Sequence, residues 1–375
     1  MSSSNQNSRK LFEKCKDNNT QEVLSLLDKK DDLRLDVNTK FEGGCTATFF
    51  AAYHGNVELL KRLMACGADI NLTEENGVSP LAVACVQGKI AAVELLLSEN
   101  HDPSQRVTGL IGACQYGYAQ VVRRLLDTGI DVNIEVDDEG ATPLYVAVET
   151  AREEVVALLL SRGADPARHR LFYYPIHVAT QISNYPIMER LLKSGAKPDV
   201  RTRDGATSLL IAAQNGFIRA VDILQSYKAS PNIQMVDGSS PLYVACSRHH
   251  ANTALKLLDS PDIDVNLKLE DGTTVLHVLA QYGNTSLIKE LLDRFSTKIE
   301  YDAKRKDGTT PLLIAARHGQ FEICQLLIDK GADLNAQCDG DTPLSVATRY
   351  GRSDTIRVLT EATNKLKEKE SKSTE

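Results

Sequence analysis

The segment Asp307–Asn335 reads DGTTPLLIAARHGQFEICQLLIDKGADLN, and variants of it recur along the chain of 375 residues. Its opening Asp-Gly pair suits a two-residue hairpin, because glycine tolerates a positive φ. Thr310 and Pro311 then favour the start of a helix, which Gly319 ends. The apolar residues that follow predict a second helix, which stops at Gly331. Each copy is therefore predicted to form a hairpin, a helix, a turn and a second helix.

The copies follow one another at a regular spacing. The glycine that ends the first helix stands at Gly55, Gly88, Gly117, Gly216, Gly283, Gly319 and Gly351. Three copies have Ala151, Ser183 or His249 at or near that position instead. The period is about 33 residues, and a unit of this size cannot bury its apolar face alone. We therefore expect the units to stack on one another.

The recurring phrases GATPLYVAVE (Gly140–Glu149) and GTTPLLIAAR (Gly308–Arg317) resemble the ankyrin repeat, and the resemblance extends from about Arg9 to about Thr360. It implies an all-α fold with short β-hairpin loops: a solenoid of about ten repeats that follow a degenerate N-terminal capping repeat at 9–40. We expect the solenoid to span 9–360. Residues 1–8 and the Lys- and Glu-rich residues 361–375 are predicted to be disordered.

Composition narrows the class of partner and the compartment. The net charge is −7, which argues against nucleic-acid binding, because phosphate contacts need a basic face. The N-terminus has no apolar segment typical of a secretion signal, and no apolar run is long enough for a membrane span. Half of the eight cysteines replace a small residue in one repeated core position. We therefore expect reduced thiols in a protein of the cytoplasm, the nucleus or both.

No catalytic motif emerges from the sequence, and we expect no enzyme activity, no metal and no cofactor. The acidic stretch Asp131–Gly140 looks calcium-like, but its glycine is misplaced. His177 and His277 occupy one repeated position. In ankyrin repeats that position often holds a histidine that hydrogen-bonds between loops, so the resemblance favours a structural role for both over a ligand or catalytic role.

In proteins that this chain resembles, a partner usually lies in a concave groove. The groove is lined by hairpin tips and by the two residues that precede the helix-ending glycine. The candidates that we single out there are Tyr53, His54, Tyr116, Arg248, Tyr282, Arg317, His318, Arg349 and Tyr350. The C-terminal end of this row predicts a basic and aromatic strip, which suits an acidic or extended peptide. Neutral variation at solvated positions is the alternative interpretation of any one of these residues.

Two units depart from the pattern. The third has Arg106 where the turn glycine is expected, and the fifth replaces its Gly-x-Thr with Phe172, Tyr173 and Tyr174. Such departures are expected at functional sites. We add Phe172 and Tyr173 to the partner-binding candidates as an exposed aromatic anchor. The alternative is that these rings fold inward and cover a stack that has lost its hairpin.

The sequence thus predicts a non-enzymatic protein–protein interaction module: a scaffold, an adaptor or an inhibitor that binds a protein or peptide. The alternative is a substrate-recognition subunit of a ubiquitin ligase or another multi-protein complex, which would need a docking segment outside the repeats. The sequence leaves the oligomeric state open, with a monomer as the simplest expectation.

Overall fold

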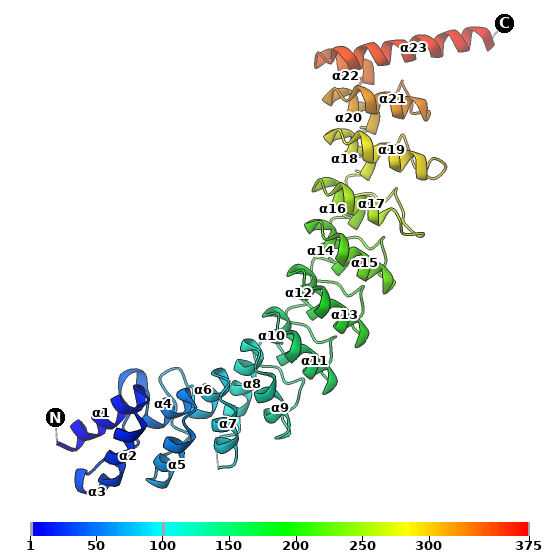
Figure 1. Cartoon of the computed structure of the whole chain (residues 1–375). Helices are drawn as coiled ribbons and strands as arrows, with labels where there is room; N and C mark the ends of the chain where they lie inside the picture. Colours follow the sequence, from blue (N-terminus) through cyan, green and yellow to red (C-terminus); the bar gives the residue numbers. More distant parts are fainter. Residues whose placement is uncertain (1–2, 100–101, 374–375) are drawn as a thin grey trace. The chain divides into compact units, whose positions relative to one another are not determined.

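The structure is a computed structural model that describes residues 3–99 and 102–373. It is built of helices joined by loops, and within these ranges no strand is longer than an isolated bridge. The chain divides into two compact units, unit 1 at Met1–Ala196 and unit 2 at Lys197–Glu375. Each unit stacks helix pairs in two rows, as the coloured ribbons of Figure 1 show. The predicted fold class, an all-helical repeat solenoid, is confirmed.

Unit 1 begins with α1 and contains both irregular repeats. Its first-row helices, the first of each pair, are α1 (Ser3–Lys16), α4 (Ala47–His54), α6 (Pro80–Val86), α8 (Ser104–Tyr116), α10 (Pro143–Glu149) and α12 (Pro175–Gln181). Its second-row helices are α2 (Thr20–Asp28), α5 (Val57–Ala65), α7 (Ile90–Leu97), α9 (Ala119–Leu126), α11 (Glu153–Ser161) and α13 (Tyr185–Lys193). Two short turns, α3 (Lys30–Leu33) and η1 (Glu42–Gly44), lie between the first two pairs.

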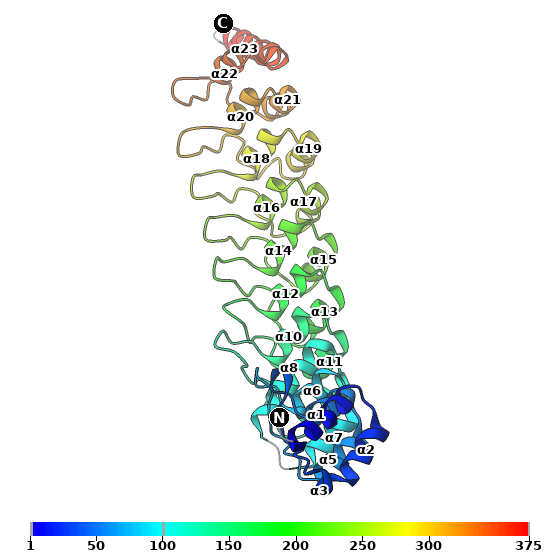
Figure 2. The same cartoon turned by 90° about the vertical axis from the view of Figure 1, so that its left-hand side faces the viewer.

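Unit 2 is more regular. Its first-row helices are α14 (Ser208–Asn215), α16 (Pro241–Ser247), α18 (Val275–Tyr282), α20 (Pro311–His318) and α22 (Pro343–Arg349). Its second-row helices are α15 (Ile218–Ser226), α17 (Ala251–Leu257), α19 (Thr285–Arg294), α21 (Phe321–Asp329) and α23 (Ser353–Ser373). Figure 2 shows the hairpin loops of this unit projecting together from the side of the first-row helices.

The repeat Asp307–Asn335 folds as the sequence predicts. The Thr310 hydroxyl accepts a hydrogen bond from the amide of Leu313, and Pro311 is the first residue of α20. Gly319 ends α20 with a left-handed φ of 76°. An added Cβ there would come within 2.9 Å of the Arg352 side chain, so the position favours glycine sterically as well. The face that α20 turns to its neighbours is fully buried, including Leu312, Ala315 and Ala316.

The three copies without the helix-ending glycine keep its backbone conformation. Ala151, Ser183 and His249 have φ values of 58°, 53° and 62°. An L-residue in this region costs about 1–2 kcal/mol relative to glycine. The repeat geometry therefore overrides the local preference of these residues.

Some hairpins differ from the predicted two-residue turn. At Asp307-Gly308 the Arg305 amide donates to the Thr309 carbonyl over 3.0 Å, which encloses a three-residue loop with Gly308 in the left-handed region. The two-residue turn occurs where Cys338 and Asp341 exchange two backbone hydrogen bonds. The Asp-Gly pair suits both loops, because a left-handed glycine is needed in each.

The irregular repeats of unit 1 depart from the pattern in different ways. The third has no hairpin in its described part; α8 instead begins early and packs closely on α6, where Gly109 lies against Cys85. The fifth keeps a hairpin: Arg170 and Tyr173 exchange two backbone hydrogen bonds around a two-residue turn. The fifth repeat has therefore kept the hairpin that the inward-folding alternative takes to be lost.

The described residues at both chain ends lie in helices, and the disorder of 1–8 and 361–375 stays a prediction. Within 1–8, α1 starts at Ser3, and the buried Ser8 hydroxyl accepts a hydrogen bond from the Asp36 amide. Within 361–375, α23 continues to Ser373. At the C-terminal end, Lys and Glu are good helix formers and extend the packed first turns of α23 at little cost. Residues 1–2 and 374–375 lie outside the described residues.

Candidate functional site

The predicted partner-binding residues fall into both units. Unit 1 holds Tyr53, His54, Tyr116, Phe172 and Tyr173, and unit 2 holds Arg248, Tyr282, Arg317, His318, Arg349 and Tyr350. All of them lie at the ends of first-row helices or in a hairpin. Most are exposed; His54 and Tyr173 are half-buried.

In unit 1, Tyr53 and His54 differ in how many contacts their side chains make within the stack. The Tyr53 ring is exposed and lies edge-on to His54, with the ring centroids 5.1 Å apart. The His54 Nε2 atom lies 2.9 Å from the Lys16 carbonyl oxygen and so links the end of α4 to the end of α1. His54 is thus engaged within the stack, whereas Tyr53 and Tyr116 present their rings to solvent.

The aromatic hairpin of the fifth repeat is partly exposed and partly packed. Leu171 and Phe172 form its tip, are 61% and 53% exposed, and have positive φ values. The Phe172 ring stacks on His169 with a centroid separation of 5.2 Å. Tyr173 turns back toward His177 and is half-buried. Each predicted alternative therefore holds for one residue: Phe172 is exposed, as an anchor would be, and Tyr173 is packed inward. Leu171 is a further exposed apolar residue, which the sequence analysis missed.

In unit 2 the C-terminal candidates surround a hollow of about 500 Å³. We call this the C-terminal hollow. Its lining comes from the end of α18, from α20 and α22, and from the hairpins before these last two helices: Gln281, Arg305, Asp307, Thr309, Leu313, Ile314, Arg317, His318, Cys338, Asp339, Asp341, Val346, Arg349 and Tyr350. Four of the predicted site residues, Arg317, His318, Arg349 and Tyr350, thus lie at one place. Arg248 and Tyr282 lie on earlier helices, where Tyr282 contacts His249 edge-on at 4.5 Å.

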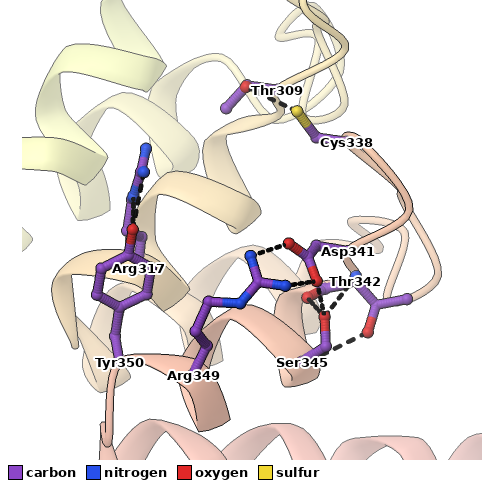
Figure 3. Close-up of polar contacts among 8 residues, drawn as sticks. All are labelled: Thr309, Arg317, Cys338, Asp341, Thr342, Ser345, Arg349 and Tyr350. Atoms are coloured by element: carbon purple, nitrogen blue, oxygen red, sulfur yellow. Dashed lines mark hydrogen bonds and ion pairs between the residues drawn. The ribbon is translucent and has the colours of Figure 1, made fainter.

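Arg317 contacts Tyr350 across the boundary between two repeats. Its Nε and Nη2 atoms donate to the Tyr350 hydroxyl over 3.1 and 2.8 Å, and the guanidinium carbon lies 5.2 Å from the ring centroid. Figure 3 shows the two side chains meeting end to end. The phenol is a neutral acceptor, so the contact leaves the charge of Arg317 uncompensated.

Arg349, by contrast, is paired with a carboxylate. Its Nη2 donates to Asp341 Oδ1 over 2.7 Å, and its Nη1 contacts Asp341 Oδ2. The Ser345 hydroxyl also donates to that carboxylate over 3.0 Å and belongs to the capping box of α22 with Thr342. In Figure 3 the Arg349 side chain points toward Asp341 and away from Tyr350. In the sequence Arg349 looked like an unpaired cation, because its partner Asp341 lies in the preceding hairpin and not on the same helix.

Two further residues of the hollow were missed by the sequence analysis. Arg305 belongs to the hairpin and is half-buried, and its buried Nε has no hydrogen-bond partner in the described part of the chain. The Cys338 thiol lies 3.1 Å from the Asp307 carbonyl oxygen, where preceding hairpins are joined by backbone amides such as that of Lys306. Cys338 occupies the position that Lys306 holds in the preceding hairpin, and this exchange was the available signal.

The charges that line the hollow differ from the basic strip that the sequence predicts. Three arginines line it, but so do Asp307, Asp339 and Asp341. Burial, with Arg317 and Arg352 nearby, lowers the pKa of His318 below its ordinary value, so the imidazole is neutral at pH 7. The hollow is therefore a mixed-charge surface with local cationic positions.

The buried titratable groups have structural roles. The His277 Nδ1 atom accepts a hydrogen bond from the Thr274 amide, and Nε2 lies 3.1 Å from the Thr309 carbonyl oxygen. Burial lowers the His277 pKa to about 4. Burial likewise raises the pKa of Cys85 and Cys114 to about 12, which makes these thiols poor nucleophiles. The predicted structural interpretation of His277 agrees with these contacts.

No group of three or more His, Cys, Asp or Glu side chains is placed to hold a metal ion within 3–99 and 102–373. In the same ranges no helix has the length and apolar character needed to cross a membrane.

The chain resembles solved and curated repeat proteins. The human ASB11 ankyrin repeat domain superposes with a TM-score of 0.54 at 25% identity, covering 59% of this chain and 98% of that one. Human transient receptor potential cation channel subfamily A member 1 is 31% identical over 176 residues, which are 44% of this chain and 16% of the channel. The mouse B-cell lymphoma 3 protein homolog is 28% identical over 225 residues, 58% of this chain and 44% of that protein.

These curated relatives are longer than the match, and the chain spans less than half of the length of each. A family model described as ankyrin repeats (3 copies) matches residues 11–107, 100–169, 176–268 and 276–370. These matches cover nearly the whole chain and coincide with the helix pairs of both units. The chain therefore belongs to the ankyrin-repeat family, whose fold is a protein–protein interaction module.

Proposed function

We propose that this chain is a non-enzymatic scaffold, adaptor or inhibitor that holds an extended segment of a partner protein in the C-terminal hollow. The observation that carries the proposal is a concavity in which the exposed Arg317 guanidinium meets only a phenol, since Arg is among the residue types that most often anchor interfaces. A volume of about 500 Å³ accommodates a few side chains of a bound segment rather than a folded domain.

The chemistry of the site supports binding rather than turnover. The hollow contains one thiol, Cys338, and one imidazole, His318, and they are not hydrogen-bonded to each other. Its hairpin side offers the Asp307 and Asp339 carboxylates and the Arg305 guanidinium, and its helical side offers guanidinium and phenol groups. Such a mixture recognises a peptide by hydrogen bonds and charge. The free state of all eight cysteines supports a reducing compartment, the cytoplasm or the nucleus.

Unit 1 provides a separate candidate contact. The exposed Leu171 and Phe172 at one hairpin tip form an apolar projection, which suits a partner surface with an apolar depression. We treat this projection as an auxiliary contact of the same module.

Site-specific crosslinking tests the proposal. A photo-reactive benzoylphenylalanine is placed either at position 350, in the C-terminal hollow, or at position 321. Phe321 is the matched control because it is similarly exposed but lies on the second-row helix α21. After irradiation in cells, we expect a partner crosslinked from position 350 and not from position 321. Crosslinks from position 321 alone would place the binding surface on the opposite helices and exclude the hollow.

A further inference from the structure

The three arginines of the C-terminal hollow differ in how their charges are met. Arg349 is compensated by Asp341. Arg317 contacts only the neutral Tyr350 hydroxyl, and no carboxylate lies within ion-pair distance of it in the part of the chain that the structure describes. The Nε of Arg305 is buried without a hydrogen-bond partner. Arg317 therefore lacks the carboxylate that its charge favours, whereas Arg305, whose charge interacts favourably with the Asp271 and Asp307 carboxylates, keeps one donor, its Nε, without an acceptor.

We propose that the C-terminal hollow recognises one carboxylate side chain of an extended peptide, held by Arg317 and Arg305, while Arg349 remains paired with Asp341. This inference rests on the proposed function and specifies the ligand chemistry of the same site. It assigns a ligand contact to Arg305 and removes one from Arg349.

Arg317 is the stronger of the two contacts. A guanidinium binds a carboxylate through two parallel hydrogen bonds, whereas the phenol offers a single oxygen to both of its donors. Exchanging the phenol for a carboxylate thus gains charge pairing at no loss of donors. Arg352, whose Nε donates to the Arg317 carbonyl oxygen, adds a second positive charge behind it. The neutral His318 adds none at pH 7.

Arg349 is the weaker candidate because its carboxylate partner is shielded. The Asp341 side chain is only 19% exposed and also accepts from Ser345. A ligand that captured Arg349 would have to compete with this carboxylate, which both Nη atoms of Arg349 already contact. The pair therefore stays closed when a peptide binds.

The aspartates of the hollow limit the kind of acid that fits. Asp307 and Asp339 line the same surface as the arginines. The Asp307 carboxylate accepts from the Thr309 amide, which fixes its negative charge at the hairpin. A run of acidic residues would meet these charges, whereas a single carboxylate between neutral or basic residues would not. This distinguishes a peptide with one acidic side chain from a polyanion such as nucleic acid.

Peptide selection provides the probe. A library of random dodecapeptides is displayed against the full chain, and a selected peptide is labelled for fluorescence anisotropy. We expect enrichment of Asp or Glu at one position, flanked by neutral or basic residues. Glu→Gln in the peptide and Arg317→Gln in the protein should each weaken binding by about tenfold or more, and Arg305→Gln by somewhat less. Combining the peptide change with Arg317→Gln should add little further loss, because both remove the same pair.

Two variants separate ligand contact from structural support. Arg349→Gln combined with Asp341→Asn removes the internal ion pair as a unit, and binding should stay within about threefold of wild type. Tyr350→Phe removes the internal acceptor of Arg317 and should preserve or strengthen binding. A loss with Tyr350→Phe as large as with Arg317→Gln would show that the Arg317–Tyr350 contact merely shapes the hollow, and would overturn the inference.

The failure of this inference differs from that of the proposed function. If no peptide is enriched, the hollow is not a peptide-binding site and both fall. If selected peptides crosslink to position 350 but carry no acidic position, or if they are insensitive to Arg317→Gln, only the carboxylate assignment falls.

Discussion

The Nε2 atom of His277 lies 3.1 Å from the carbonyl oxygen of Thr309, so an imidazole at the start of α18 links its repeat to the hairpin of the next one. On its other side, Nδ1 accepts from the Thr274 amide. The ring therefore serves as acceptor and donor at once, which only the neutral form can do. Its burial makes the charged form costly as well.

This contact predicts a pH dependence of stability. Burial lowers the His277 pKa from 6.5 to about 4 in the folded state, so the unfolded chain binds more protons between these values. The His277 contribution is present above about pH 6.5 and is lost as the pH falls toward 4, by up to about 3 kcal/mol. We expect His277→Leu, which copies Leu313 of the next repeat, to reduce the difference between urea midpoints at pH 7 and pH 5. Equal pH differences for both proteins would contradict this.

Three residues with a left-handed backbone stand where other repeats have glycine, and replacing one of them with glycine should raise the stability of the protein. Ala151 is exposed with a φ of 58° and ends α10 in a conformation that disfavours a Cβ. Ala151→Gly should stabilise the protein by about 0.5–1 kcal/mol, after the larger entropy of glycine in the unfolded chain is subtracted. Urea denaturation followed by circular dichroism measures this change.

Ala147→Gly is the control for that substitution. Ala147 is fully buried within α10, where glycine loses helix propensity and a packed methyl group. It should destabilise the protein by about 1–2 kcal/mol. A loss of stability with Ala151→Gly of the same size would mean that the left-handed conformation is not a source of strain.

Asparagine side chains bridge successive repeats at a second position. The Asn266 Nδ2 atom donates to the Lys298 carbonyl oxygen over 2.7 Å, and its Oδ1 accepts from the Glu300 amide over 2.9 Å. Asn266→Ala should cost about 1–2 kcal/mol, because both backbone groups lose a partner. The equivalent Asn335 is exposed and makes no such bridge in the described residues, so Asn335→Ala should change the urea midpoint little. Similar losses from the two variants would exclude the bridging role.

The sequence predicted the helices well because their signals are local. Thr310, Pro311 and Gly319 cap and end α20 through contacts within a few residues. The turn type at Asp307-Gly308 was not predictable in the same way, since one residue of loop length separates it from the turn at Asp339-Gly340 and both use the same dipeptide. The repeat period then fixed which residues are buried, as Leu312 illustrates.

The candidate site was less predictable because charge pairing is not local. Arg317 and Arg349 occupy equivalent positions in successive repeats and look alike in the sequence. Only the fold shows that a hairpin aspartate, Asp341, neutralises Arg349 and that Arg317 faces a phenol. Arg305 was overlooked because it flanks the three-residue loop of its hairpin, whereas the resemblance supplied only the hairpin tips and the helix ends.

The close contact of α6 and α8 predicts that an added side chain at this contact destabilises the protein, and that a second substitution relieves the clash. A Cβ added at the buried Gly109 would lie 2.8 Å from the Cys85 Sγ, and a buried thiol has little room to move. Gly109→Ala should therefore destabilise the protein by about 1–2 kcal/mol, although alanine favours helix formation. Cys85→Ala removes the clashing sulfur and restores the alanine that other repeats carry at this position, as at Ala213 and Ala316.

We expect the double variant to be more stable than Gly109→Ala alone, which a double-mutant cycle of urea midpoints measures as a favourable coupling. Gly331→Ala is the steric control, because an added Cβ there meets no atom within 4 Å. Because the φ of Gly331 is 98°, any loss of stability in Gly331→Ala comes from backbone strain, which Cys85→Ala cannot relieve. Additive effects of Gly109→Ala and Cys85→Ala would show that the helices separate freely, and that the glycine is not what lets α8 replace a hairpin.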